Sequence, residues 1–244
     1  MSSDSPAGTT QARRSRKRAR AVSALAIAAA VLIAGCGIPQ FVFIAPPVLG
    51  VAEPVERTMT FGHSEDNDLD SFLGYEVYYK FYDPAATAAF ADDRLAIRNA
   101  SPGIVTTVLR TRGYRRVHER DATGRRPPLI PVVGDERRQR FSVLLEFHQD
   151  PPTGAVASWS VVEPRRVELV RDPAVTLTPQ VGFTPSELTP GTPPDLPGTP
   201  EPDQGRFLMG LAVLSYGIDY VTGTFSELYS TAIVPDDLLW MGYQ

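Results

Sequence analysis

The chain has 244 residues and one cysteine, and its formal net charge of −4 comes from 24 lysine and arginine residues against 28 aspartate and glutamate residues. A single cysteine excludes a framework of internal disulfides. The acidic balance argues against nucleic acid or anionic lipid as the main partner, and the length suits one large domain or two small ones.

The first 35 residues have the order of a secretory signal. Six basic residues lie within 13–20, an apolar run follows over 21–34, and Gly35 precedes the cysteine, Cys36. Basic, apolar and then small residues are typical of such a signal. The apolar run is shorter than the roughly 20 residues of a usual spanning helix. We therefore expect residues 1–35 to be a leader.

The run Ile33-Ala34-Gly35-Cys36 resembles the lipobox of bacterial lipoproteins. The resemblance implies that the thiol of Cys36 receives a diacylglyceryl group, that cleavage falls between Gly35 and Cys36, and that the new amino group is acylated. Two or more acyl chains give stable anchoring, at about 0.8 kcal/mol per buried CH2. The resemblance also implies an exported protein, anchored to a membrane of the bacterial cell envelope through this lipid.

The residue after the cysteine bears on the choice of membrane. In enteric lipoproteins an aspartate at that position is linked to inner-membrane retention, and here Gly37 takes its place. The resemblance therefore favours the outer membrane over the inner membrane.

Other interpretations of Cys36 stay open. Residues 21–38 are 18 mostly apolar residues, a borderline length for an uncleaved signal anchor, and plain secretion or a different start codon are further alternatives. If 1–35 are removed, six basic residues and one acidic residue leave with them. The chain that remains has 18 basic and 27 acidic residues, a net charge of about −9. We therefore expect no nucleic-acid partner. From the lipid anchor we expect the membrane as a partner, with another envelope protein as a further one.

The chain after the leader begins with a proline-containing stretch and then a strong strand. Residues 36–56 predict a tether and a first edge strand, since proline is tolerated at sheet edges. A short strand is expected over 57–61, and an acidic loop follows over 63–70. Residues 72–82, FLGYEVYYKFY, alternate with period two and are rich in aromatic and β-branched residues, which predicts a half-buried strand.

The middle of the chain predicts two helices and further strands. Asp83 and Pro84 are typical of a helix start, so we expect a helix to about residue 98, and a second one from Ser101-Pro102 to Gly113. Strands are expected over 114–120 and over 140–147, where Phe141, Val143, Leu145 and Phe147 face inward, and around Trp159 and Val167.

The last quarter begins with a proline-rich segment. Residues 184–205 cannot bury enough apolar surface to fold alone, which predicts a surface loop. Residues 207–214 are apolar on both faces and predict a buried strand. Residues 215–223 are expected to turn the chain, and residues 227–234 to return as a partner strand.

Three stretches resemble strands of fibronectin III domains. Residues 74–82 are similar to the third strand, 211–219 to the penultimate strand and 227–234 to the last. The resemblance implies a mainly β fold, an immunoglobulin or fibronectin III-like sandwich over 57–244. Because such a domain has about 90–100 residues, it also implies a large α+β insertion at about 83–183, besides the loop at 184–205.

The lipobox, the strand at 72–82 and the Ser215-Tyr216-Gly217 strand together resemble uncharacterised lipoproteins of spirochaete type. That resemblance implies an envelope location and no known activity.

The acidic loop is the candidate metal site. Asp66, Asp68 and Asp70 alternate, and clustered carboxylates in a loop can supply the six to eight oxygen ligands of calcium. The EF-hand pattern is not met, because Ser71 stands where glycine is required and Val77 where an acid is required. The alternative is a solvated turn that discourages edge pairing.

No other pattern indicates catalysis. The three histidines are dispersed, and the sequence has no GxSxG elbow and no glycine-rich phosphate loop. Tyr78 and Tyr82 flank Lys80 on the second face of the strong strand, which is either a ligand-binding surface or a face covered by the inserted segment. We therefore expect a non-enzymatic binding or structural module, with no cofactor beyond the covalent lipid. The alternative is an envelope enzyme or small-ligand receptor with its site in the inserted segment.

Overall fold

The computed structural model describes residues 42–120, 128–147, 154–161, 163–171, 181–188, 194–197, 206–220 and 225–242. The folded unit considered below begins at Phe43. Its described residues form two antiparallel sheets of six strands each, so the prediction of a mainly β, sandwich-like fold is confirmed. None of the helices among these residues is long and apolar enough to cross a membrane.

Sheet A has the strand order β1-β2-β7-β8-β9-β5. The bounds of its strands are β1 (Val48–Glu53), β2 (Thr58–Gly62), β7 (Ser142–Phe147), β8 (Ala155–Ser160), β9 (Pro164–Val170) and β5 (His118–Glu119). The edge position of β1 agrees with the edge strand predicted within 36–56. The inward side chains of β7 are those expected from its alternation, since Val143, Leu145 and Phe147 are all buried.

Sheet B has the order β11-β10-β3-β4, with β12 paired to β10 and β6 paired to β3. The bounds of its strands are β11 (Ser226–Tyr229), β10 (Arg206–Asp219), β3 (Phe72–Tyr82), β4 (Arg115–Arg116), β12 (Leu239–Gly242) and β6 (Ile130–Pro131). The strand β3 has the predicted bounds. The short strand β12 was not predicted.

The strand β10 runs further than the sequence indicated. Residues 215–219 of the predicted turn at 215–223 instead belong to β10, where Tyr216 pairs with both Gly74 of β3 and Tyr229 of β11, and 221–223 lie outside the described residues. The residue Gly217 allows this close pairing, since a Cβ atom there would lie 2.2 Å from the carbonyl oxygen of Ser71. Gly217 therefore lies within a continuous strand, although the sequence around it had suggested a turn.

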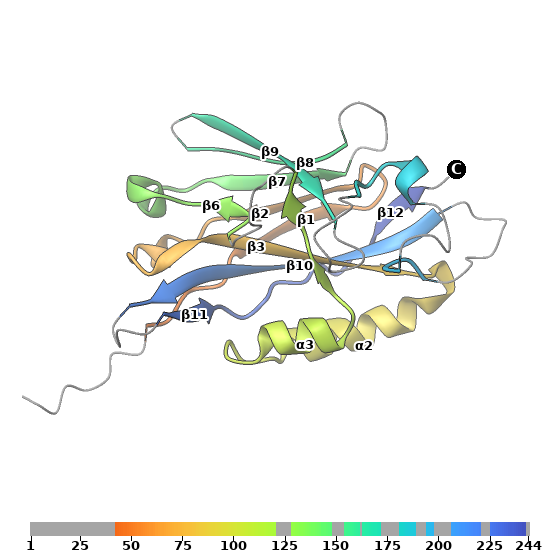
Figure 1. Cartoon of the computed structure of the whole chain (residues 1–244), viewed down its shortest axis with the longest axis horizontal. Coiled ribbons are helices and arrows are strands. Elements are labelled where there is room, and N and C mark those ends of the chain that lie inside the picture. The colour runs from red at the N-terminus through yellow and green to blue at the C-terminus, as the bar shows by residue number, and fades with distance from the viewer. Residues whose placement is uncertain are drawn as a thin grey trace, which may run out of the picture. The chain divides into compact units, whose positions relative to one another are not determined.

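The two sheets and two helices form three layers (Figure 1). The main core lies between the sheets and includes Met59, Tyr79, Leu145, Trp159 and Met209. The outer face of sheet B carries the helices α2 (Thr87–Arg98) and α3 (Val105–Thr111), with a second core that includes Phe90, Ile97, Leu109, Tyr114 and Leu214. Both faces of sheet B are therefore buried, which explains why residues 207–214 are apolar on both sides.

Local sequence signals explain where the helices start and stop. Asp83 accepts a hydrogen bond from the Ala85 amide and precedes the 3₁₀ turn η2 (Pro84–Ala86), which leads into α2. The second helix starts later than predicted, at Val105. It ends before Gly113, whose φ of +82° suits a residue without a Cβ atom.

The segment 83–183 contributes to all three layers. It supplies α2 and α3, four of the six strands of sheet A (β5, β7, β8 and β9), and β4 and β6 of sheet B. The predicted single strand over 114–120 is instead two short strands in different sheets. Sheet A is therefore built mostly from residues that the sequence had suggested were inserted into a sandwich.

Candidate functional site

The predicted site residues fall in two places. Gly35 and Cys36 lie outside the described residues, so the lipid attachment stays a prediction. Asp66, Asp68 and Asp70 lie in the loop between β2 and β3, around the 3₁₀ turn η1 (Glu65–Asn67).

A buried histidine fixes the start of this acidic loop. Nε2 of His63 lies 2.8 Å from the carbonyl oxygen of Arg137, and Nδ1 lies 2.5 Å from the hydroxyl of Tyr75. Because a carbonyl oxygen only accepts, Nε2 carries the proton and Nδ1 accepts from Tyr75. The ring also stacks on Phe141 at 4.7 Å. Burial lowers the pKa of His63 and so favours the neutral ring, in which Nδ1 accepts from Tyr75.

A buried asparagine fixes the middle of the loop. The amide nitrogen of Ala45 donates to Oδ1 of Asn67 at 2.8 Å, and Nδ2 of Asn67 donates to the carbonyl oxygen of Ala45 at 2.9 Å. The same carbonyl accepts from Oγ of Ser215 in β10. These bonds join the acidic loop, the chain just before β1 and the central strand of sheet B.

The acidic side chains of the loop mostly face arginines. Both carboxylate oxygens of Asp68 lie 2.9 Å from Nε of Arg138, and Asp70 lies 3.0 Å from Nη1 of Arg137. Across the described residues, no group of three or more histidine, cysteine, aspartate or glutamate residues is arranged to hold a metal ion. Calcium at Asp66, Asp68 and Asp70 stays a prediction, and binding there would have to displace two guanidinium partners.

An open groove of about 540 Å³ lies beside the acidic loop. Its walls come from β1, the end of β2, the loop and the start of β7. They are formed by Val48, Gly62, His63, Ser64, Glu65, Asp66, Arg140, Phe141 and Ser142. Because Glu65 and Arg140 form an ion pair there, the groove offers both a cationic and an anionic group to a polar ligand.

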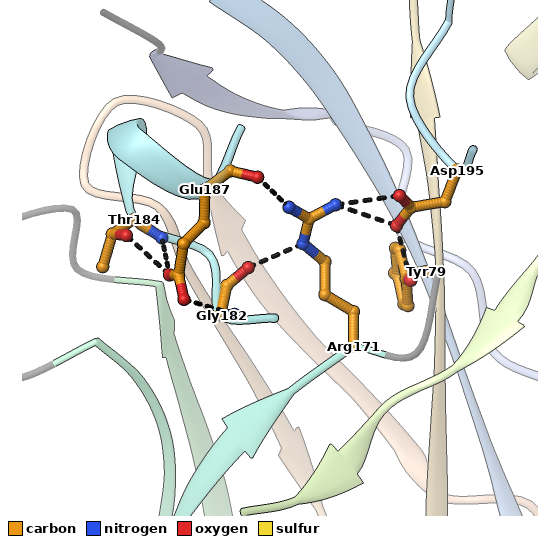
Figure 2. A network of polar contacts seen from close by, with 6 residues as sticks. All are labelled: Tyr79, Arg171, Gly182, Thr184, Glu187 and Asp195. Atoms are coloured by element: carbon orange, nitrogen blue, oxygen red, sulfur yellow. Dashed lines mark hydrogen bonds and ion pairs between the residues drawn. The ribbon is translucent and has the colours of Figure 1, made fainter. Parts of the chain in front are cut away.

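Among the ion pairs of the described residues, the most buried joins Arg171 and Asp195, within a cluster of polar contacts (Figure 2). The guanidinium of Arg171 donates from Nε to the carbonyl oxygen of Gly182 at 2.6 Å, from Nη2 to that of Glu187, and from Nη1 to both carboxylate oxygens of Asp195 at 3.0 and 2.9 Å. The side chains of Arg171 and Asp195 are 0% and 1% exposed. The charge is thus paired inside the protein, as a buried guanidinium requires.

Neighbouring groups complete the cluster. The hydroxyl of Tyr79 donates to Asp195 at 2.7 Å, and burial, together with the Asp195 carboxylate, raises the pKa of Tyr79 well above its ordinary value. Glu187 accepts from the amides of Gly182 and Thr184 at 2.9 and 3.2 Å. The cluster therefore fastens the described parts of 181–197 to β3 and β9.

Two more polar clusters lie on the outer face of sheet B. Asp93 of α2 accepts from Lys80 at 2.6 Å and from Tyr82 at 2.9 Å. Glu76 accepts from the hydroxyl of Tyr78 at 2.8 Å, and burial raises the pKa of Glu76. As one of the two sequence interpretations proposed, this face is covered by residues of the segment 83–183.

Sequence patterns did not point to the Arg171 cluster. Arg171 ends a strand pattern and Asp195 lies in a proline-rich segment, and no spacing rule connects them. One local signal was present, because Thr184 and Glu187 have the spacing of a helix capping box and make its hydrogen bonds.

A scan against models of protein families gave no match for this chain, and searches of curated proteins and of solved structures gave no significant match.

Proposed function

We propose that this protein is a lipid-anchored protein of the bacterial cell envelope, acting as a non-enzymatic binding or structural module. The observation that carries the proposal is the order of basic residues, apolar run and Ile33-Ala34-Gly35-Cys36. A thiol in that setting is a lipid attachment point, and the outer membrane is the favoured location because Gly37 follows it.

The way the chain enters the folded unit supports this proposal. Six residues, 37–42, separate Cys36 from Phe43, where the folded unit begins. Two residues later, Ala45 is held by hydrogen bonds to Asn67 and Ser215. A lipid on Cys36 would therefore be connected to a firmly attached segment through a short tether.

The polar clusters support a structural or binding role. Arg171, Asp93 and Glu76 each connect a strand of a sheet to another segment of the chain. Their charged side chains connect segments of the chain to each other, as expected for residues that stabilise the fold.

We further propose a fibronectin III-like arrangement for sheet B. Of the three stretches that resemble the third, penultimate and last strands of that fold, the first two lie within β3 and β10, and the last overlaps β11. These strands are neighbours in the order β3-β10-β11, and immunoglobulin-type sandwiches have the same order C, F and G. The helices on its outer face and the strands that 83–183 adds are departures from that fold.

Metabolic labelling tests the lipid anchor. Cells that express the full chain should incorporate labelled palmitate into it, and globomycin should leave the leader attached. Cys36→Ala should abolish both labelling and cleavage, whereas the control Pro39→Ala should retain them. Absence of palmitate from the wild-type chain would contradict the proposal. Cell fractionation with surface proteolysis then separates outer-membrane from inner-membrane location.

The groove beside the acidic loop favours a second candidate, a small-ligand receptor or an enzyme of the envelope. Arg140 and Phe141 bring residues of the segment 83–183 into its wall. Calcium is the first ligand to test, because a ligand that binds the native state raises the melting temperature. A rise with calcium that Asp66→Asn removes and the exposed control Asp92→Asn retains would support this candidate, and an unchanged melting curve would count against calcium.

A further inference from the structure

Exposed apolar side chains are concentrated at the start of the folded unit. Of the twelve large hydrophobic residues that are exposed in the described parts of the chain, five fall within 43–55. They are Phe43, Val48, Leu49, Val51 and Val55. The same stretch contains one charged residue, Glu53. Five exposed apolar residues along one edge strand and the residues next to it differ from the single ones scattered over most protein surfaces.

A tryptophan and two arginines extend this surface at the end of β1. The amide of Trp240 in β12 donates to the carbonyl oxygen of Pro54 at 3.2 Å, and Nε of Arg57 donates to the carbonyl oxygen of Trp240 at 2.8 Å. The guanidinium of Arg206 lies 4.2 Å from the centre of the Trp240 ring, which is 41% exposed. Half-exposed tryptophan beside arginine is typical of the lipid–water interface.

The backbone of β1 argues against pairing with another strand. A bulge interrupts its register with β2 between Leu49 and Ala52. Inside the bulge, the amide of Val51 donates to Oγ1 of Thr60 at 3.1 Å, and a Cβ atom on Gly50 would lie 2.3 Å from the carbonyl oxygen of Thr60. Bulges at sheet edges hinder the addition of a further strand. The edge therefore offers its side chains to a partner and not a regular backbone ladder.

The proposed anchor determines which partner lies within reach. The seven steps from the Cα atom of Cys36 to that of Phe43 span at most about 25 Å, so a lipid on Cys36 keeps Phe43, at the start of this surface, near the bilayer. A tethered contact of this kind needs little affinity of its own, because tethering makes the second contact intramolecular.

We propose that Phe43, Val48, Leu49, Val51, Val55 and Trp240, named here the anchor-proximal patch, lie on the bilayer that holds the Cys36 lipid. This inference rests on the proposed function. The patch inserts apolar side chains among the headgroups, and Arg206 and Arg57 face the lipid phosphates. The carboxylates of Glu65 and Asp66 lie in the groove next to Val48 and would be repelled by anionic lipid. We therefore take a zwitterionic lipid surface as the partner.

Single-cysteine labelling tests this contact in the full-length, lipidated chain. Cys36 is the natural cysteine and its thiol carries the lipid, so a new cysteine is the free thiol. Val51→Cys and Val55→Cys would each carry an environment-sensitive fluorophore. Ser160→Cys is the control, an exposed position at the end of β8, three strands away from β1. The proteins are reconstituted in phosphatidylcholine vesicles with and without a nitroxide on the lipid acyl chain.

We expect blue-shifted emission and nitroxide quenching at positions 51 and 55, and neither at position 160. Adding Val51→Asp should reduce the quenching at position 55, because a carboxylate resists entry into the interface. Some protein will carry labelled palmitate and float with the vesicles. If quenching in that protein is equal at all three positions, or absent from all three, the contact of the patch with the bilayer is overturned and the anchor is not. Energy transfer between copies labelled at position 51, without nitroxide quenching, would assign the patch to a second copy instead. Protein without palmitate that does not float would overturn the proposed anchor itself.

Discussion

Two ion pairs in this protein have nearly the same geometry and opposite surroundings. Nη1 of Arg171 lies 3.0 and 2.9 Å from the two carboxylate oxygens of Asp195, and Nε of Arg138 lies 2.9 Å from both oxygens of Asp68. The first pair is 0% and 1% exposed, and the second is 68% and 48% exposed. Distance alone therefore does not measure what an ion pair contributes, because water screens the second pair and is excluded from the first.

The two regions also differ in what positions the chain. Around Arg171, the charges themselves hold the segment 181–188 and Asp195 in place. In the acidic loop, the buried side chains of His63 and Asn67 make the connections to the rest of the fold, and the ion pairs lie outside them. The conspicuous charges of the loop are thus less important to its structure than one histidine and one asparagine.

The largest effect is expected from Asp195→Asn. It leaves the guanidinium of Arg171 buried without a counter-charge, and breaking a buried pair in this way costs about 3–5 kcal/mol. Urea unfolding of the purified full-length protein measures the loss. A change below about 1 kcal/mol, the range of exposed pairs, would contradict the role assigned to this cluster.

An intermediate effect is expected from Asp93→Asn. Asp93 is buried, but its partners Lys80 and Arg112 have side chains 25% and 43% exposed and can turn toward water. We expect a loss of about 2 kcal/mol, the value of a hydrogen bond to a charged group. The neighbouring Asp92→Asn, on the exposed side of α2, is the matched control and should leave the unfolding free energy unchanged.

The stability should depend on pH through His63. Burial lowers the pKa of His63 below its ordinary value of 6.5 in the folded protein, so the unfolded chain binds the proton more readily. The contribution of His63 is therefore fully present above pH 6.5, and it decreases as the pH falls below 6.5 toward the folded-state pKa. Unfolding free energies measured across this range should slope less steeply in His63→Gln. An identical slope in both proteins would show that His63 is not the group responsible.

The smallest effect is expected from Asp68→Asn. Both Asp68 and Arg138 are in contact with water, so losing their pair should leave the melting temperature of the full-length protein within measurement error. A loss as large as that of Asp195→Asn would mean that geometry, and not burial, determines the strength of these pairs.

Local patterns predicted the strands and helices well where one face is buried and the other is not. The alternation of 72–82 and of 140–147 and the Asp83-Pro84 helix start all correspond to elements in the structure. These signals are carried by neighbouring residues, so a single sequence contains them.

The sheet membership of the middle segment was not predictable in the same way. Residues 114–120 read as one strand, yet β4 and β5 belong to different sheets, because the partner strands that decide this are distant in the chain. The Arg171 cluster was missed for the same reason. Its partners come from β3, from the end of β9 and from the described parts of 181–197, and no spacing along the chain encodes their contact.

The pairing of β3 with β10 has a consequence for how the chain must be made. Strand β3 lies in the first half of the sequence and β10 near its end, yet they pair along almost their entire length. Contacts so distant in sequence form late and slowly, after a large loop-closure cost. A chain that emerges from its N-terminus therefore exposes the aromatic edge of β3 until nearly all other residues have been delivered. During that interval the unpaired edge of β3 is open to pairing with other chains and to aggregation.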